Sequence, residues 1–298
     1  MSEYKDYIIR ATAADGQVRA FAATTTNLVA HAQRIHGLSP VAAAGLGRLM
    51  TAAAMMGIDM KGEGNSLSII LRGGGPLGSL VVVATSSGKI KGYVDNPNVY
   101  LPLNSYGKLD VSGAVGKEGK LTVIKDLGLK EPYVGQVDIV SGEIGDDIAF
   151  YMASSEQKPS AVGLGVLVDV DSTVSAAGGF MIQPLPGASE EIIEKIENRI
   201  SNIPGVSTLI SEGKTPEEIL KTLLDDYELK VHDKIYPYFL CDCNRERLES
   251  VLITLGRDEL EDILKKDGKA ELVCHYCNKK YIFDYDDIQK LIESIDQK

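Results

Sequence analysis

Four cysteines gathered near one end of the chain form its strongest chemical signal. Cys241 and Cys243 make a Cys-x-Cys pair, and Cys274 and Cys277 make a Cys-x-x-Cys pair after the intervening residues 244–273. Four thiolates satisfy a tetrahedral Zn²⁺ ion at zinc–sulfur distances of about 2.3 Å. The pattern therefore predicts one zinc ion bound by all four cysteines. A secreted disulfide scaffold is not expected, because such chains are short and spread their cysteines along their length.

The chemical role of such a site has two interpretations. Four protein ligands leave no coordination position for water or substrate, which argues against hydrolytic zinc catalysis. His275 could replace one cysteine, although four thiolates are at hand. In the first interpretation the metal only folds residues 233–298, with a binding free energy of about 10–16 kcal/mol. In the second, an oxidant attacks the thiolates, the sulfurs pair and zinc leaves, so that oxidation unfolds the domain. Spacing alone favours the first.

Composition and charge limit the possible partners. The 298 residues are 44% hydrophobic and 24% charged, as in a soluble globular protein, and the formal net charge is −11. An acidic surface disfavours binding to nucleic acid and to anionic membranes. The start of the chain has no secretory signal, and its most apolar stretch, 41–56, contains Arg48. The protein is therefore predicted to be soluble and cytoplasmic.

Residues 1–187 are predicted to form an α+β domain of mixed sheet and helix. Asp15-Gly16 favours a hairpin turn, and Thr26 or Asn27 can cap a helix that Gly37 ends. Ser39 and Pro40 start a second helix over 41–56, which is apolar on most sides and so predicted to be buried. Candidate strands cover 66–71, 78–84, 89–94, 121–125, 136–140, 147–152, 162–170 and 174–183. Runs of strands with grouped helices are typical of an α+β fold.

Residues 188–232 are predicted to form an amphipathic helical linker. One helix ends at Pro204-Gly205, and a second begins after the capping residue Thr215. The apolar face of the first helix consists of Ile192, Ile193, Ile196, Ile200 and Ile203, and that of the second of Ile219, Leu220, Leu223 and Leu224. Two interpretations fit: ordinary packed helices, and a detachable linker whose apolar faces cover a partner surface.

Residues 233–298 are predicted to form a small zinc-binding domain. Helices are expected over 245–255, 257–266 and 286–295, and a hairpin over 269–273 and 279–283, with the second cysteine pair at its turn. Four nearby cations are expected to offset part of the negative charge of a zinc tetrathiolate: Arg245, Arg247, Lys279 and Lys280.

Longer motifs resemble a known family over essentially the whole chain. The cysteine-bearing segments 239–247 and 274–281 resemble the redox-switch domain of the 33 kDa chaperonin family, the oxidation-activated heat-shock holdases of bacteria. The segments 73–78, 142–147, 154–157 and 178–183 resemble parts of the N-terminal domain of that family.

This resemblance implies an ATP-independent chaperone and not an enzyme. The reduced, zinc-bound form would be inactive. Oxidation would form the disulfides Cys241–Cys243 and Cys274–Cys277, release zinc, loosen the linker and produce a homodimer. The active form would bind unfolding client proteins and protect thermally unfolding and oxidatively damaged chains from aggregation. A Cys-x-Cys disulfide closes a very small ring, so we expect it to be strained and readily reduced.

Two other functions are set against this one. A zinc-ribbon adaptor could bind nucleic acid or protein. Lys279, Lys280, Tyr276 and Tyr281 could form a basic and aromatic patch for nucleic acid, but acidic residues follow at once, which favours a solvated hairpin edge, and each of the three regions is acidic overall. An enzyme would need a catalytic constellation. Gly73-Gly74-Gly75 lacks the Gly-Lys-Ser/Thr that follows in a phosphate-binding loop, and no Gly-x-Ser-x-Gly nucleophile motif is present.

Overall fold

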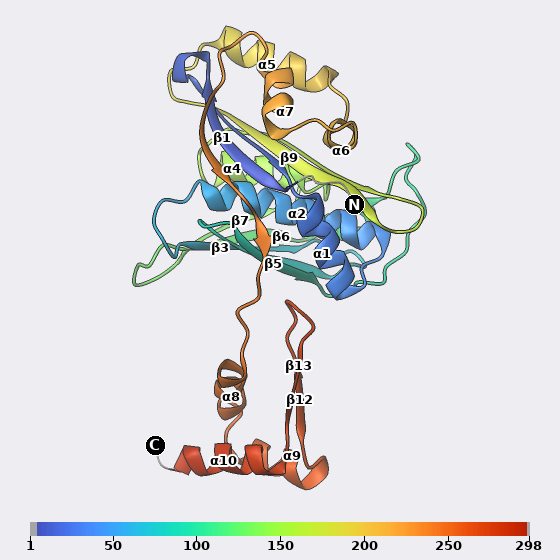
Figure 1. The fold of residues 1–298 in the computed structure, drawn as a ribbon, viewed down its shortest axis with the longest axis vertical. Coiled ribbons are helices and arrows are strands. Elements are labelled where there is room, and N and C mark those ends of the chain that lie inside the picture. Colours follow the sequence, from blue (N-terminus) through green and yellow to red (C-terminus); the bar gives the residue numbers. More distant parts are fainter. Residues whose placement is uncertain (1–4, 297–298) are drawn as a thin grey trace. The chain divides into compact units, whose positions relative to one another are not determined.

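In the computed structural model, which describes residues 5–296, the chain forms two compact units, residues 1–240 and 241–298 (Figure 1). The predicted linker, 188–232, lies within the first unit. The predicted domain boundaries after residues 187 and 232 remain predictions, whereas the predicted α+β class is confirmed.

Two β-sheets form the framework of the first unit. The five-stranded sheet has the order β10-β1-β2-β9-β8, and the six-stranded sheet has the order β11-β5-β4-β3-β6-β7. All neighbouring strands are antiparallel except β11 and β5. The strands of the first sheet are β1 (Tyr7–Ala13), β2 (Val18–Thr24), β8 (Ala161–Val168), β9 (Val174–Pro184) and β10 (Lys230–Ile235). Those of the second are β3 (Ser66–Arg72), β4 (Ser79–Thr85), β5 (Lys89–Val94), β6 (Lys120–Asp126), β7 (Tyr133–Asp138) and β11 (Tyr238–Phe239).

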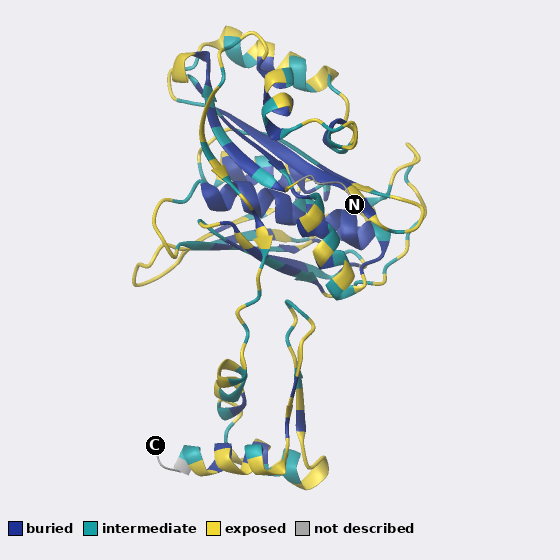
Figure 2. Cartoon of the chain, in the orientation of Figure 1, coloured by how far each residue is buried: buried dark blue, intermediate teal, exposed yellow. Residues whose placement is uncertain are grey.

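Helix α2 (Pro40–Ile58) lies between the two sheets and forms the centre of the core (Figures 1 and 2). It is long and apolar enough to cross a membrane, but 94% of its most apolar window is buried inside the protein. Small residues let it approach its neighbours closely. A Cβ atom at Gly47 would lie 2.6 Å from Cγ1 of Val29. The prediction of a buried helix capped by Ser39 is confirmed, since the Ser39 hydroxyl accepts a hydrogen bond from the backbone N–H of Ala42.

Helix α1 (Thr26–His36) starts at a cap that is remote in sequence. The backbone N–H groups of Asn27 and Leu28 donate to the buried carboxylate of Asp6, at 3.1 and 2.7 Å. The prediction that Thr26 or Asn27 caps this helix was therefore wrong. Its predicted end is confirmed: Gly37 has φ 60°, a left-handed conformation that suits glycine.

The predicted strand 147–152 was also wrong, because these residues belong to helix α4 (Gly145–Ser154). The carboxylate of Asp147 accepts hydrogen bonds from the backbone N–H groups of Val140, Ser141 and Ile144 at 2.8, 3.0 and 3.1 Å. This network folds the preceding turn against the helix start. The local alternation of apolar residues could not indicate it. The short helix α3 (Val111–Val115) was not predicted.

Three helices cover the outer face of the five-stranded sheet: α5 (Glu190–Asn202), α6 (Val206–Ser211) and α7 (Pro216–Leu223). They form a second apolar core with β1, β2 and β9, which is the layer above the sheet in Figures 1 and 2. Ser189 caps α5, and Thr215 caps α7 as predicted; the Glu218 carboxylate accepts from the N–H of Thr215 at 2.8 Å. Helix α6 and strand β10 were not predicted.

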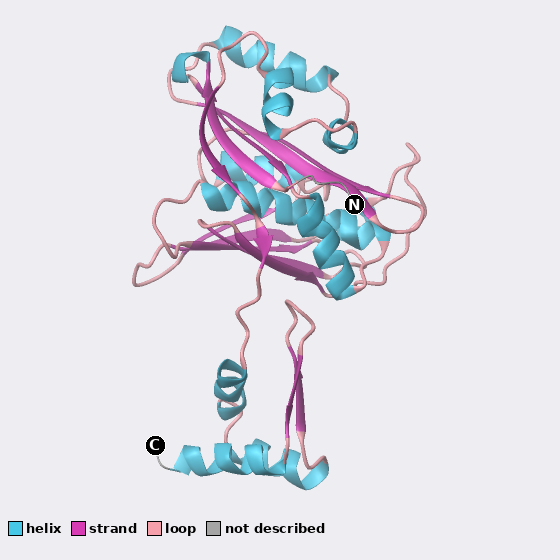
Figure 3. Ribbon diagram, in the orientation of Figure 1, coloured by secondary structure: helices cyan, strands magenta, loops and turns pink. Residues whose placement is uncertain are grey.

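Up to residue 296, where the described part of the chain ends, the second unit consists of three helices and one hairpin (Figure 3). These are α8 (Arg245–Ile253), α9 (Arg257–Lys266), β12 (Ala270–Val273), β13 (Lys280–Phe283) and α10 (Tyr285–Asp296). A small core of its own holds them together, with Leu252, Leu260, Phe283 and Ile288 at most 1% exposed. All five elements were predicted within a few residues.

Candidate metal centre

The four cysteine sulfurs converge within the second unit. All four Sγ atoms lie within 4.8 Å of one another, and the thiols are free and half-buried. The Sγ atoms of Cys241 and Cys274 are 3.6 Å apart, and those of Cys243 and Cys277 are 3.4 Å apart. A zinc tetrathiolate with bonds of about 2.3 Å has sulfur–sulfur separations of about 3.8 Å. The cluster therefore could hold one metal ion of this kind.

Two different local structures present the cysteine pairs. Cys241 and Cys243 precede α8, whose cap is Asn244: its side-chain oxygen accepts from the N–H of Arg247 at 2.8 Å. Cys274 and Cys277 lie in the turn between β12 and β13, as predicted. The N–H of Asn278 donates to the carbonyl of Cys274 at 2.8 Å, so the turn folds back toward its own first residue.

Tyr281 is a neighbour of the cluster whose role the sequence did not indicate. Its ring is 7% exposed, and its hydroxyl lies 3.3 Å from Sγ and 3.1 Å from the carbonyl oxygen of Cys243. The sequence favours a solvated hairpin edge for this residue. The structure instead places its hydroxyl against one of the four thiols.

The four thiols have unequal environments. Burial raises the pKa of Cys241, and raises the pKa of Cys277 to about 11. Burial also acts on Cys243, but hydrogen bonds from Tyr281 and the neighbouring thiols outweigh it and lower the pKa of Cys243 to about 7. Metal ligation requires the thiolate forms, which a bound cation stabilises.

The nearby cations interact mainly with carboxylates and aromatic rings. Arg247 contacts Asp242 at 2.6 Å, and Lys280 contacts Glu271 at 3.0 Å. Two further contacts involve Arg245 with Asp287 at 2.5 Å and Lys279 above the ring of Tyr281. The expectation that these four cations offset the thiolate charge remains a prediction.

The donor set indicates which metal fits. Thiolates are soft ligands that select zinc and similar ions over magnesium or calcium. Among the described residues, the cluster contains the four predicted cysteines and not His275. Sequence reasoning therefore found the residues of the cluster; their identity as zinc ligands remains a proposal.

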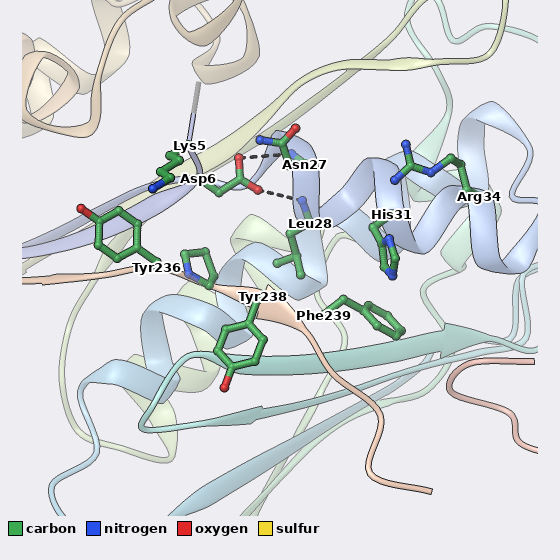
Figure 4. Close-up of a pocket in the computed structure, with 10 residues that line it drawn as sticks. Lys5, Asp6, Asn27, Leu28, His31, Arg34, Tyr236, Tyr238 and Phe239 are labelled. Carbon is green, nitrogen blue, oxygen red and sulfur yellow. Dashed lines mark hydrogen bonds between the residues drawn. The ribbon is translucent and has the colours of Figure 1, made fainter. Parts of the chain in front are cut away.

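A pocket of about 460 Å³ lies in the first unit where the segment 236–239 passes α1 (Figure 4). Its wall includes aromatic, basic and acidic side chains: Tyr236, Tyr238, Phe239, Lys5, His31, Arg34 and Asp6. The rings of His31 and Phe239 are tilted against each other with centroids 5.1 Å apart. This contact helps to hold the segment that leads to the first cysteine.

Comparison with known proteins covers nearly the whole chain. The family model described as Hsp33 protein matches residues 6–284. The 33 kDa chaperonin of Acetivibrio thermocellus is 52% identical over 294 residues, covering 99% of each chain. That of Geobacillus sp. is 50% identical over 293 residues, covering 98% of this chain and 99% of the relative. The crystal structure of the 33 kDa chaperonin of Thermotoga maritima, a heat shock protein 33 homologue, matches with a TM-score of 0.92 at 38% identity, covering 99% of this chain and 100% of that chain.

The chain has two sheets around a buried helix and a separate unit with four clustered thiols. Together with these matches, this architecture identifies a chaperone and not an enzyme. The chain belongs to the Hsp33 family. The family resemblance noted in the sequence is thereby confirmed.

Proposed function

We propose that this protein is a redox-regulated holdase that needs no ATP. The observation that carries the proposal is the convergence of four free thiols in a small unit of a chaperone-family chain. In the reduced state Cys241, Cys243, Cys274 and Cys277 bind one Zn²⁺, and the protein is inactive. The metal's chemical contribution is structural: it fixes thiolates that the small core of residues 241–298 alone would hold weakly.

Oxidation removes the ligands of the metal. Disulfides form between Cys241 and Cys243 and between Cys274 and Cys277. Each pair of thiolates gives two electrons to one hydrogen peroxide molecule, which takes up two protons and becomes two water molecules. Zn²⁺ then leaves, because disulfide sulfurs are poor ligands. Thiol reductants reverse the step by breaking both disulfides.

Activation uncovers apolar surface under the linker. Helices α5, α6 and α7 bury one face of the five-stranded sheet, including Phe180 and Ile182. Much of the sheet side of this interface is alanine, at Ala11, Ala13, Ala20 and Ala22. The helices contribute the larger side chains, such as Leu220 and Leu223, so their release uncovers apolar surface on both sides of the interface. The exposed face then binds unfolding client proteins and prevents their aggregation.

The activated protein forms a homodimer, acts in the cytoplasm during oxidative stress, and binds neither nucleic acid nor membranes. The net charge of −11 supports the last two points.

One experiment tests the switch. Reduced, zinc-loaded protein is treated with peroxide at mildly elevated temperature. Zinc release, followed with a chromogenic chelator, and light scattering by a thermally unfolding client are recorded in the same sample. Both signals should appear together and reverse with thiol reductant. Zinc that remains bound, or zinc release without suppression of scattering, would return the cysteines to a structural role. A sample without peroxide is the control for heat alone.

A further inference from the structure

The edge of the five-stranded sheet is closed by a strand that is weakly packed. Strand β10 pairs antiparallel with β1, from Ile8 opposite Ile235 to Thr12 opposite Lys230, with an irregularity between Arg10 and Ala11. Of its six residues only Asp233 and Ile235 are partly buried, and the other four are exposed. Ile235 alone packs against the apolar core.

Polar contacts supply most of the side-chain interactions of β10. Asp233 forms an ion pair with Arg10, and the imidazole Nε2 of His232 lies 2.8 Å from the hydroxyl of Thr12. The Nζ of Lys234 lies 3.6 Å from the ring centroid of Tyr7. Dissociation of β10 therefore exposes little apolar area of its own. The strand is held mainly by its backbone hydrogen bonds to β1 and by exposed charges.

The neighbouring strand, β1, is much more deeply buried. Ile8, Ile9, Ala11 and Ala13 are at most 1% exposed, with Ile8 in the core around α2 and the other three in the core under α5–α7. Without β10, β1 would be a regular apolar edge with unpaired N–H and C=O groups. Such an edge is a template for another extended chain.

We propose that β10 occupies a client-binding site: in the activated protein an extended, alternately apolar segment of an unfolding chain replaces it and pairs antiparallel with β1. This inference rests on the proposed release of the linker, since β10 follows α7 after the short segment 224–229. Backbone hydrogen bonds give affinity that does not depend on client sequence. The face uncovered by α5–α7 receives the apolar side chains that alternate along the client strand.

Charge distinguishes a client strand from a second copy of this chain. Arg10 is the middle residue of β1, and Asp233 lies opposite it in the resting ladder. Two β1 strands paired antiparallel over their full length would place Arg10 opposite Arg10, which is unfavourable. The edge therefore prefers a segment with an acidic or neutral residue at its centre, as in β10 itself.

A peptide of residues 229–236, labelled with a fluorophore, tests the inference. Its binding to the full-length protein is measured by fluorescence anisotropy before and after peroxide activation. Binding is expected only after activation. Two further peptides carry N-methyl groups, one at the residues whose N–H groups point toward β1 and one at the residues whose N–H groups point away, assigned separately on the two sides of the irregularity between Arg10 and Ala11. One set should weaken binding at least about tenfold, because it removes ladder hydrogen bonds, and the other should have little effect.

A charge exchange tests the register. The double variant Arg10→Glu with Asp233→Arg keeps an ion pair in the resting ladder. After activation the wild-type chain should prefer the native peptide over its Asp233→Lys form by about two- to fivefold, and the double variant should reverse this preference.

The possible outcomes separate this inference from the proposed holdase. Suppression of client aggregation without peptide binding, or equal effects of both N-methyl sets, would overturn strand replacement and leave the holdase intact. Peptide binding in the expected pattern without suppression of aggregation would support the edge site and contradict the holdase. If the peptide dissociates the dimer but does not compete with the client, the edge is a contact between copies of the chain, and the inference is wrong.

Discussion

At the scale of single residues, the contact between Tyr281 and Cys243 restrains one of the four thiols. A phenol has one proton, and here it lies within reach of both the sulfur and the carbonyl oxygen of the same cysteine. In the proposed zinc-bound state Cys243 is already a thiolate, so this hydrogen bond adds no further thiolate but lowers the nucleophilicity of the sulfur toward an oxidant. The tyrosine hydroxyl is therefore placed to slow the oxidation of the first cysteine pair.

Removal of this hydroxyl should sensitise the switch. In Tyr281→Phe the buried ring remains, but the hydrogen bond, worth about 0.5–1.5 kcal/mol, is lost. We expect peroxide to release zinc several times faster, as measured with a chromogenic chelator. Tyr285→Phe is the matched control, because Tyr285 is 54% exposed. Equal release rates in Tyr281→Phe and the wild type would show that the hydroxyl only supports packing.

Asp6 should make the stability of the first unit depend on pH. Burial raises the pKa of its carboxyl group from 3.8 to about 6, against the opposing effect of the N–H donors of Leu28 and Asn27. The folded state therefore holds more protons than the unfolded state between about pH 4 and pH 6. Stability falls as the pH rises through this window, by about 3 kcal/mol in total.

The variant Asp6→Asn cannot ionise and should lack this dependence. The free energy of unfolding of variant and wild type is measured by urea denaturation at pH 4.5 and pH 7. Relative to the wild type, the variant should be more stable at pH 7 than it is at pH 4.5. Other titrating groups cancel in this comparison. A difference that is the same at both pH values would contradict the raised pKa.

At the scale of elements, we expect the interface between α7 and the five-stranded sheet to set the threshold for the proposed release of the linker. Leu220 is fully buried there. Leu220→Ala should weaken this packing by about 2–5 kcal/mol. We expect residues 188–232 to be cleaved faster in limited proteolysis, and client aggregation to be suppressed at lower peroxide. Lys221→Ala, in the same helix but exposed, is the control and should behave as the wild type. Faster cleavage with an unchanged peroxide requirement would show that release of the linker does not control activation.

The elements also show which features the sequence can predict. Local signals sufficed where the partner is nearby, as in the Asp15-Gly16 turn, the Ser39 cap and the Thr215 cap. They failed where a distant residue forms the cap: Asp6 accepts hydrogen bonds from α1 residues that are 21 and 22 positions away in the sequence. Strand β10 has mostly polar, exposed side chains and exists because β1 offers it an edge, so no apolar periodicity indicates it. The cysteines were predictable because ligand type and spacing are local properties.

At the scale of the whole molecule, the two units should differ in their dependence on metal. The first unit has two extensive apolar cores, whereas the second has a single small one. In the proposed zinc-bound state, a structural ion worth about 10–16 kcal/mol would therefore dominate the stability of residues 241–298.

Removal of zinc under reducing conditions should unfold only the second unit. A strong chelator is expected to abolish hydrogen-exchange protection in α8, α9 and α10 and to leave α2 protected. Re-addition of zinc should restore the protection, and chelator already saturated with zinc serves as the control. Retained protection in α8–α10 after complete metal loss would mean that the small core folds unaided.

Only Leu240 separates strand β11 from Cys241, and this short connection restricts insertions and deletions at this point of the chain. The backbone N–H of Leu240 donates to the carbonyl of Ile90 at 3.1 Å, and Cys241 is the next residue. A rearrangement of the backbone at Cys241 therefore reaches a hydrogen bond of the six-stranded sheet across a single peptide bond. Surface loops elsewhere can gain or lose residues at little cost. A flexible insertion after residue 240 would instead let the two units respond to oxidant and to heat as separate proteins.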